Sequence, residues 1–173
     1  MKCDVLVVGA SSAGVMAAIS AAEGGASVML LDRNLGRLHH DANTLFEGMA
    51  AVSGIEIKDC LLKKELEGMR ILSPSGRGVT IPAKGYFIDR DAFDRHYLHL
   101  AEKAGVALLS GEVRSLHLEG NGRTVGLKGV QIHARVVIDA SGVQSGLSEK
   151  AGLKPMRHPE DIAWAVEADI EYP

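Results

Sequence analysis

Features of disulfide scaffolds, nucleic-acid binders and membrane spans are scarce in this sequence. Two cysteines, Cys3 and Cys60, are too few for a disulfide framework. Three Tyr, three Phe, one Trp and a net charge of −3 offer neither stacking surfaces nor a basic face, so no nucleic-acid partner is expected. No apolar run approaches the ~20 residues that span a bilayer, and no signal peptide is expected, because the first strand begins by residue 4. We therefore expect a cytoplasmic protein, with peripheral contact to a membrane left open.

The N-terminal part has instead the layout of a dinucleotide-binding βαβ unit. The apolar run Val5–Val8 precedes the turn Gly9-Ala10-Ser11-Ser12-Ala13-Gly14, an alanine-rich segment and a second apolar run that ends at Asp32. A short continuous apolar run is typical of a strand buried on both faces. Small residues would let backbone N–H groups and the helix N-terminus approach a pyrophosphate. The pattern predicts a strand over 4–8, a helix over 12–24 and a strand over 27–32.

The residues of this turn have separate expected roles. Gly9 would allow a sharp turn, and Gly14 would let the helix lie close to the strand. The small residues expected at the pyrophosphate are Ala10, Ser11 and Ala13, with Ser11 where the G-x-G-x-x-G pattern has its middle glycine. Asp32 lies eighteen residues after Gly14, close to the ~20 expected for an acid that binds a ribose hydroxyl. The alternative is an ordinary strand–helix turn in which Asp32 only caps a strand end.

Beyond the βαβ unit, the sequence predicts further α/β elements. Asp91 would be the N-cap of a helix that ends before Gly105. The turn Glu119-Gly120-Asn121-Gly122 predicts an antiparallel hairpin. The expected helices cover 43–51, 58–66, 91–104 and 144–151. The expected strands are two or three segments between 69 and 88, then 106–109, 112–118, 123–132, 136–138 and an amphipathic strand over 162–172 with an unpaired edge.

Two later segments resemble the geranylgeranyl reductase family of FAD-dependent oxidoreductases. The first runs Tyr86-Phe87-Ile88-Asp89-Arg90-Asp91-Ala92-Phe93. The second runs Val136-Val137-Ile138-Asp139-Ala140-Ser141-Gly142, an apolar strand followed by an Asp-Ala-Thr-Gly-like turn in which Ser141 replaces Thr. Together with the N-terminal turn, these motifs cover nearly the whole chain in the family's order.

The resemblance implies a Rossmann-like parallel sheet with flanking helices, a small antiparallel β-meander and the first strand of an absent substrate domain. The FAD-binding domain would cover 1–157, and the truncated substrate-domain sheet would begin within 158–173. The resemblance implies FAD contacts at the pyrophosphate from Gly9, Ala10, Ser11, Ala13 and Gly14. Asp32 would bind the ribose, Arg33 would lie beside the adenine, and the Val113 backbone would hold the adenine. Arg90 would lie near the phosphate or ribityl chain, and Asp139 and Gly142 would shape a turn beside the cofactor. Each also has an ordinary structural interpretation, such as a solvated Arg90 or an Asp139 that satisfies local N–H groups.

Several functions stay open at this point. The family suggests reduction of prenyl-lipid double bonds, whereas the absent half favours a non-catalytic nucleotide-binding or interaction module that pairs with a partner chain, the missing half or itself. The order Ser11, Asp139, His158 loosely suggests a hydrolase. FAD is favoured over NAD(P), a lipid is the suggested substrate, and no catalytic residue or metal site is assigned. The loop 37–44 lacks the Pro and the Cys-Gly pair that family members usually carry there. His39, His40 and Asp41 in this loop are adjacent and would not converge on one metal ion without further ligands.

Overall fold

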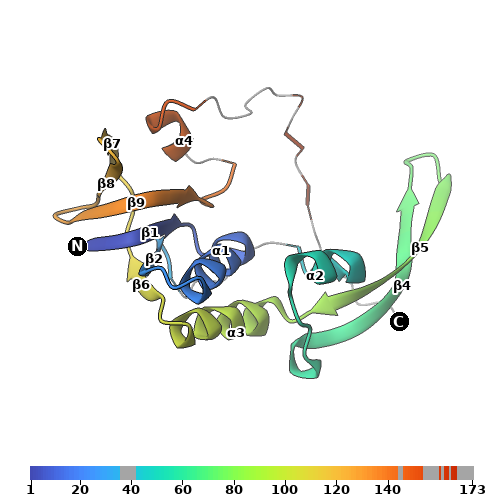
Figure 1. Ribbon diagram of the computed structural model, residues 1–173. Helices are drawn as coiled ribbons and strands as arrows, with labels where there is room; N and C mark the ends of the chain where they lie inside the picture. Colours follow the sequence, from blue (N-terminus) through green and yellow to red (C-terminus); the bar gives the residue numbers. More distant parts are fainter. Residues whose placement is uncertain (36–41, 144–145, 154–159, 161, 164, 167–173) are drawn as a thin grey trace. The chain divides into compact units, whose positions relative to one another are not determined.

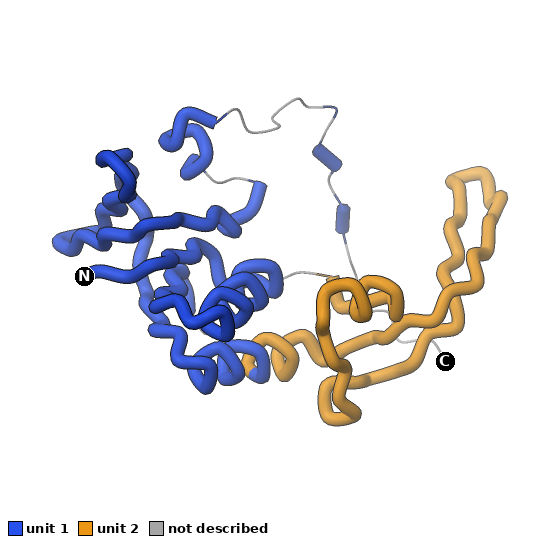
Figure 2. The backbone as a smooth tube through the Cα atoms, viewed as in Figure 1, with its two compact units in different colours: residues 1–37, 96–173 blue, residues 38–95 orange. Residues whose placement is uncertain are grey.

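The computed structural model describes residues 1–35, 42–143, 146–153, 160, 162–163 and 165–166. The elements in chain order are β1 Lys2–Val8, α1 Ser12–Glu23, β2 Val28–Asp32, β3 Thr44–Phe46, α2 Glu47–Ser53, the 3-10 helix Asp59–Leu61, β4 Leu62–Leu72, β5 Gly78–Ile88, α3 Arg90–Lys103, β6 Ala107–Ser110, β7 Ser115–Glu119, β8 Gly122–Gly126, β9 Gln131–Asp139 and α4 Leu147–Lys150 (Figure 1). They form two compact units, residues 1–37 with 96–173 and residues 38–95 (Figure 2). The expected boundary near residue 157 lies outside the described residues and stays a prediction.

The first unit is built on a six-stranded sheet in the order β6-β2-β1-β9-β8-β7. β6, β2, β1 and β9 are parallel, whereas β7 and β8 continue the sheet as antiparallel strands beyond β9. The expected fold class, a Rossmann-like parallel sheet with helices and an antiparallel meander, is therefore confirmed. The meander is continuous with the parallel sheet through β9.

The central parallel strands β1 and β2 are buried as their apolar sequences predict. Leu6 and Val7 in β1 and Leu30 and Leu31 in β2 are fully buried. α1 packs against β1 and β2, and its buried residues include Val15, Ala18 and Ile19. A core cluster combines β1 and β2 with the meander and α4, and its buried members are Cys3, Leu6, Val8, Leu31, Val125, Ile132, Ala134 and Leu147. Burial raises the pKa of the Cys3 thiol.

Two expectations in the first unit are wrong in detail. The strand expected over 123–132 is divided by a second turn, in which the Leu127 N–H donates to the Val130 carbonyl at 2.8 Å and Gly129 has φ +76°. Only glycine adopts this left-handed backbone without strain. The helix expected over 144–151 is only the single turn Leu147–Lys150 among the described residues.

The second unit contains a three-stranded antiparallel sheet, β3-β5-β4. The helix expected over 43–51 begins only at Glu47, after the short strand β3. The helix expected over 58–66 is wrong beyond Leu61, because β4 begins at Leu62. The segments expected between 69 and 88 are one long hairpin of two eleven-residue strands. In Figure 2 its outer part extends as a two-stranded arm from the rest of this unit.

The helix expected to start at Asp91 starts at Arg90. Asp89 is the capping residue, because its Oδ1 accepts the Ala92 N–H at 3.0 Å. This bond holds the pKa of the Asp89 carboxyl below its usual range.

The strand expected over 162–172 lies mostly outside the described residues. The described residues 162, 163, 165 and 166 are not in a strand, and Val166 is 97% exposed. The pairing expected through this segment stays a prediction.

Candidate functional site

Three turns meet where β2, β1 and β9 end in the first unit. The turn after β1 carries the glycine-rich sequence, the turn after β2 begins at Asp32, and the turn after β9 begins at Asp139. The Gly9 N–H donates to the Leu31 carbonyl, and the Ala140 N–H donates to the Val8 carbonyl, each at 2.8 Å. In the sheet, β2 and β6 lie on one side of β1, and β9 lies on its other side, so the strand order reverses at β1. In open α/β sheets, ligands bind outside the carboxyl ends of the strands at such a reversal.

Gly9 and Gly14 are required by the packing of these turns. Gly9 has φ +104°, and a Cβ there would lie 2.8 Å from Ser141 Cα and overlap the Ala140 backbone. A Cβ on Gly14 would overlap the Gly9 carbonyl oxygen and lie 3.2 Å from Ala140 Cβ. The expected geometry of a sharp turn at Gly9 and a close helix at Gly14 is therefore present. The approach of Ala140 to Gly9 was not expected, because it joins residues that are distant in the sequence.

Asp32 fixes the shape of the glycine-rich turn. Its side chain is buried, with the residue 8% exposed. Oδ2 accepts the Ala10 N–H and Oδ1 accepts the Asn34 N–H, both at 2.8 Å. Of the N–H groups expected at a pyrophosphate, that of Ala10 therefore already has a carboxylate acceptor. Ribose recognition by Asp32 stays a prediction.

The N-terminus of α1 has the chemistry of an anion site. Ser11 is its N-cap and makes no side-chain capping bond, and the first turn contains no acidic residue. The first N–H groups of a helix have no partner within that helix, and its dipole favours negative charge there. Ser11 and Ala13 are therefore placed where the sequence predicts a pyrophosphate, next to glycines that admit no side chain.

The turn after β9 is held by Asp139. Its Oδ1 accepts hydrogen bonds from both the N–H and the hydroxyl of Ser141. Gly142 has φ +89° with open space where a Cβ would be, so its backbone conformation, not crowding, favours glycine. The geometry agrees with the structural interpretation of Asp139 as a turn residue, and a direct contact with the cofactor stays a prediction.

The remaining predicted residues lie outside these three turns. Arg33 follows Asp32 and is exposed. Val113 is half-buried and packs against the core cluster, so its side chain has a structural role. The segment before it is tied to β2, since the Gly111 N–H donates to the Asp32 carbonyl at 2.9 Å. The adenine contact proposed for the Val113 backbone is untested.

Arg90 belongs to the second unit, at the start of α3. Its Nε donates to Asp94 Oδ1 at 2.9 Å, and Nη1 donates to the Ala42 carbonyl at 3.4 Å. The guanidinium carbon lies 5.6 Å from the centre of the Phe93 ring. Arg90 is therefore partly buried and already paired, which differs from the solvated charge considered as its alternative.

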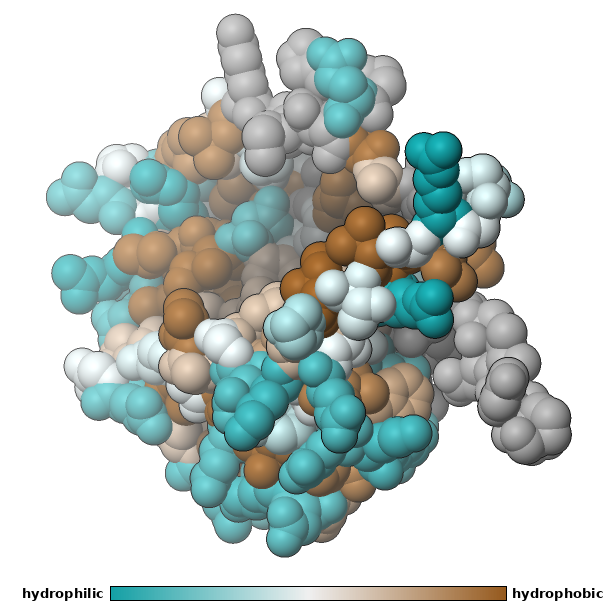
Figure 3. Space-filling model, turned by 90° about the vertical axis from the view of Figure 1, so that its right-hand side faces the viewer, coloured by the Kyte–Doolittle hydropathy of each residue, from teal (hydrophilic) through white to brown (hydrophobic). Residues whose placement is uncertain are grey.

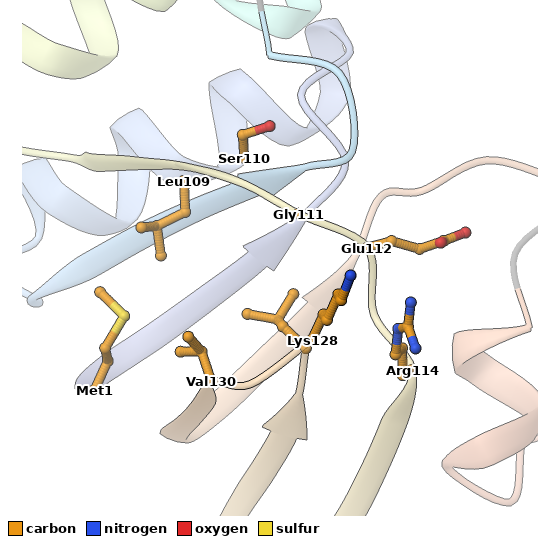
Figure 4. A pocket seen from close by; sticks show the side chains of 9 residues that line it. Met1, Leu109, Ser110, Gly111, Glu112, Arg114, Lys128 and Val130 are labelled. Atoms are coloured by element: carbon orange, nitrogen blue, oxygen red, sulfur yellow. The ribbon is translucent and has the colours of Figure 1, made fainter.

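A pocket of about 230 Å³ lies beside β6 and the 127–130 turn (Figure 4). Its lining residues are Met1, Leu109, Ser110, Gly111, Glu112, Arg114, Leu127, Lys128 and Val130. Figure 4 shows the Leu109 and Ser110 side chains leaving the chain on opposite sides. Neither the glycine-rich turn nor Asp32 lines this pocket, so it is separate from the three turns.

Other residues singled out from the sequence add little to this site. His158, His39, His40 and Asp41 lie outside the described residues. None of the helices in the described part of the chain is long and apolar enough to cross a membrane.

The sheet order, the glycine-rich turn and the helix N-terminus define a dinucleotide-binding protein of the α/β class. The chain belongs to the FAD dependent oxidoreductase family, whose model matches residues 4–156. This match confirms FAD as the expected cofactor of the family and sets the hydrolase hypothesis aside.

Curated relatives confirm the resemblance stated from the sequence. A digeranylgeranylglycerophospholipid reductase of Methanopyrus kandleri is 34% identical over 180 aligned residues, covering 98% of this chain and 45% of the relative. A reductase of the same name from Methanothermobacter thermautotrophicus is 32% identical and covers 98% of this chain and 46% of the relative. The chain therefore spans less than half the length of these relatives.

A solved structure agrees with the fold. The geranylgeranyl bacteriochlorophyll reductase-like protein of Thermoplasma acidophilum aligns with a TM-score of 0.76 at 27% identity. The alignment covers 88% of this chain and 42% of that protein.

Proposed function

We propose that this chain is the FAD-binding portion of a flavin-dependent reductase that saturates double bonds of geranylgeranyl lipids. The observation that carries the proposal is the set of three turns around Gly9, Asp32 and Ala140, in a chain related to digeranylgeranylglycerophospholipid reductases. Reduced FAD supplies a hydride which, with a proton, adds two hydrogens across a carbon–carbon double bond.

The residues of this chain would bind and orient the cofactor. Gly9 and Gly14 leave the turn without side chains, and the N-terminus of α1, whose N-cap Ser11 makes no side-chain capping bond, would present backbone N–H groups and its dipole to the pyrophosphate. Asp32 holds the turn in shape through Ala10 before any ligand binds. Such preorganisation reduces the ordering cost of binding.

The first test is an absorbance spectrum of the purified chain, before and after addition of FAD and desalting. Flavin bands that survive desalting support the proposal. A colourless chain that ignores added FAD contradicts the proposal that it forms a sufficient site, and favours an interaction module.

A charge variant locates the pyrophosphate. Ser11→Asp keeps a good N-cap residue but places a carboxylate at the proposed phosphate position, so FAD affinity should fall by about tenfold or more. Ser75→Asp in the β4–β5 turn is the matched control and should leave affinity unchanged. Equal FAD affinities in the two variants would contradict the placement of the pyrophosphate.

A further inference from the structure

Ala140, in the turn after β9, contacts the β1–α1 segment in three ways. Its N–H donates to the Val8 carbonyl at 2.8 Å. Its carbonyl group occupies the space where a side chain on Gly9 would lie, and its Cβ lies 3.2 Å from the position that a Cβ on Gly14 would take. Ala140 therefore lies against both glycines of the turn from a segment that is distant in the sequence.

These contacts limit the size of the residue at position 140. Among the described residues only glycines have a positive φ, so the backbone at Ala140 admits a larger side chain. The neighbouring atoms are the constraint, because methyl groups added on the side of Gly14 would press on the first turn of α1. Close-packed contacts of this kind do not absorb added atoms without displacement of the main chain.

The main chain that Ala140 contacts is the part proposed to bind the pyrophosphate. Gly14 lies in the first turn of α1, whose N-cap Ser11 makes no side-chain capping bond. Backbone N–H groups at a helix N-terminus bind an anion in the direction in which the main chain holds them. The side chain of alanine has no donor or acceptor, so its effect on a pyrophosphate would act through the position of the turn.

The contact differs from the apolar surface of the molecule. In Figure 3 apolar atoms lie exposed among hydrophilic ones, and the described residues do not show what covers them. Both sides of the Ala140 contact, in contrast, belong to this chain and to its first unit. The contact is therefore defined without a partner.

We propose that Ala140 is a positioning residue for the cofactor. It holds the glycine-rich turn and the start of α1 in the arrangement that presents backbone N–H groups to the FAD pyrophosphate. This role rests on the proposed function, because it requires that the turn binds FAD. It predicts that FAD affinity falls as the side chain at position 140 becomes larger.

FAD titration of size variants tests this role. Ala140→Val should lower the affinity by about tenfold, and Ala140→Ser, which adds a single atom, by about threefold. Ala140→Gly leaves the space open and should lose less than Ala140→Val. Ala134→Val is the matched control, because it makes the same change in the same strand where Ala134 pairs with Cys3 and is 4% exposed. It should lower the urea midpoint and retain FAD affinity.

A loss of affinity in Ala134→Val equal to that in Ala140→Val would overturn the positioning role, because lost stability would then explain both. An affinity that is unchanged in both Ala140→Val and Ala140→Ser would overturn it as well. The serine variant keeps the test decisive if the valine variant does not fold.

Amide resonances of the ligand-free chain give a second readout that does not require FAD. Ala140→Val should shift the resonances of Gly9 and Gly14, whereas Ala134→Val should shift those around Cys3. Unshifted Gly9 and Gly14 resonances would overturn the role of Ala140. Shifted resonances in a chain that binds no FAD would contradict the proposed function and support the placement of Ala140 against the turn.

Discussion

The two units of this chain stabilise their sheets in different ways. In the first unit, the central parallel strands β1 and β2 are buried, with Leu6, Leu30 and Leu31 fully excluded from solvent. In the second unit, the described apolar side chains that are buried are Ala50, Leu61, Ile88 and Phe93, and the outer hairpin exposes its own. Parallel sheets need cover on both faces, whereas antiparallel ribbons tolerate one open face.

This difference predicts that the two units respond differently to mutation. The glycine-rich turn leaves a buried strand and is fixed by Asp32, Gly9 and Ala140, so a small steric change there should act on folding and binding together. The residues of the outer hairpin are exposed, so changes there should hardly act on folding. The predictions below test this division.

The largest effect is expected from Gly14→Ala. A Cβ at Gly14 would overlap the Gly9 carbonyl oxygen, so either α1 or the turn must move, at a cost of about 3 kcal/mol of unfolding free energy. FAD affinity should fall as well. Gly48→Ala in α2 of the second unit meets no atom within 4 Å and should stabilise that helix slightly. Urea unfolding of both variants would contradict the packing argument if their midpoints moved alike.

The next effect is expected from Asp32→Ala. It leaves the N–H groups of Ala10 and Asn34 without their carboxylate acceptor, which should cost about 1–3 kcal/mol. Asp59→Ala, at an exposed position of the second unit, is the matched control. Guanidinium unfolding measures the change in stability of both variants, and FAD titration measures the change in their affinity. Normal stability with lost FAD affinity would show that Asp32 serves only the ribose.

The sequence predicted the parts of this site that depend on local pattern. The apolar run to Val8, the small-residue turn and the acid at Asp32 follow one another within a single βαβ unit, so periodicity and spacing place them. The role of Gly14 follows from the same local geometry. The apolar strand before Asp139 is equally local, and its turn is where the motif predicts it.

The rest depends on contacts between distant segments. Nothing local indicates that Ala140 approaches Gly9, or that the Ala10 N–H is bound by Asp32. The β4–β5 hairpin was expected as short segments because Leu62–Leu72 has charged residues at 63–65 and lacks clear alternation. Asp89 and Asp91 are both adequate N-caps by type, and only the backbone decides between them.

A smaller effect is expected from Asp89→Ala at the start of α3. The Ala92 N–H donates to the carboxylate and lowers its pKa. A lowered folded-state pKa means that this contribution is complete above the unfolded-state pKa and is lost as pH falls through the folded value. Asp89→Ala should therefore lower the urea midpoint at neutral pH. The midpoint of the variant should also fall less than that of the unmodified chain as the pH is lowered into the acid range. Asp91→Ala should do neither, and the opposite ranking would restore Asp91 as the cap.

The smallest effect on stability is expected from Ile71→Thr with Val79→Thr. Ile71 and Val79 pair across β4 and β5, and both side chains are more than half exposed, so the lost cross-strand contact should cost about 0.5 kcal/mol. Thermal unfolding measures this cost, with Val136→Thr as the matched change in the first unit. A large loss in the hairpin variant would mean that these side chains are covered in solution by a second copy. A small loss would show that the outer hairpin adds little to the folding free energy, in contrast to the buried turns of the first unit.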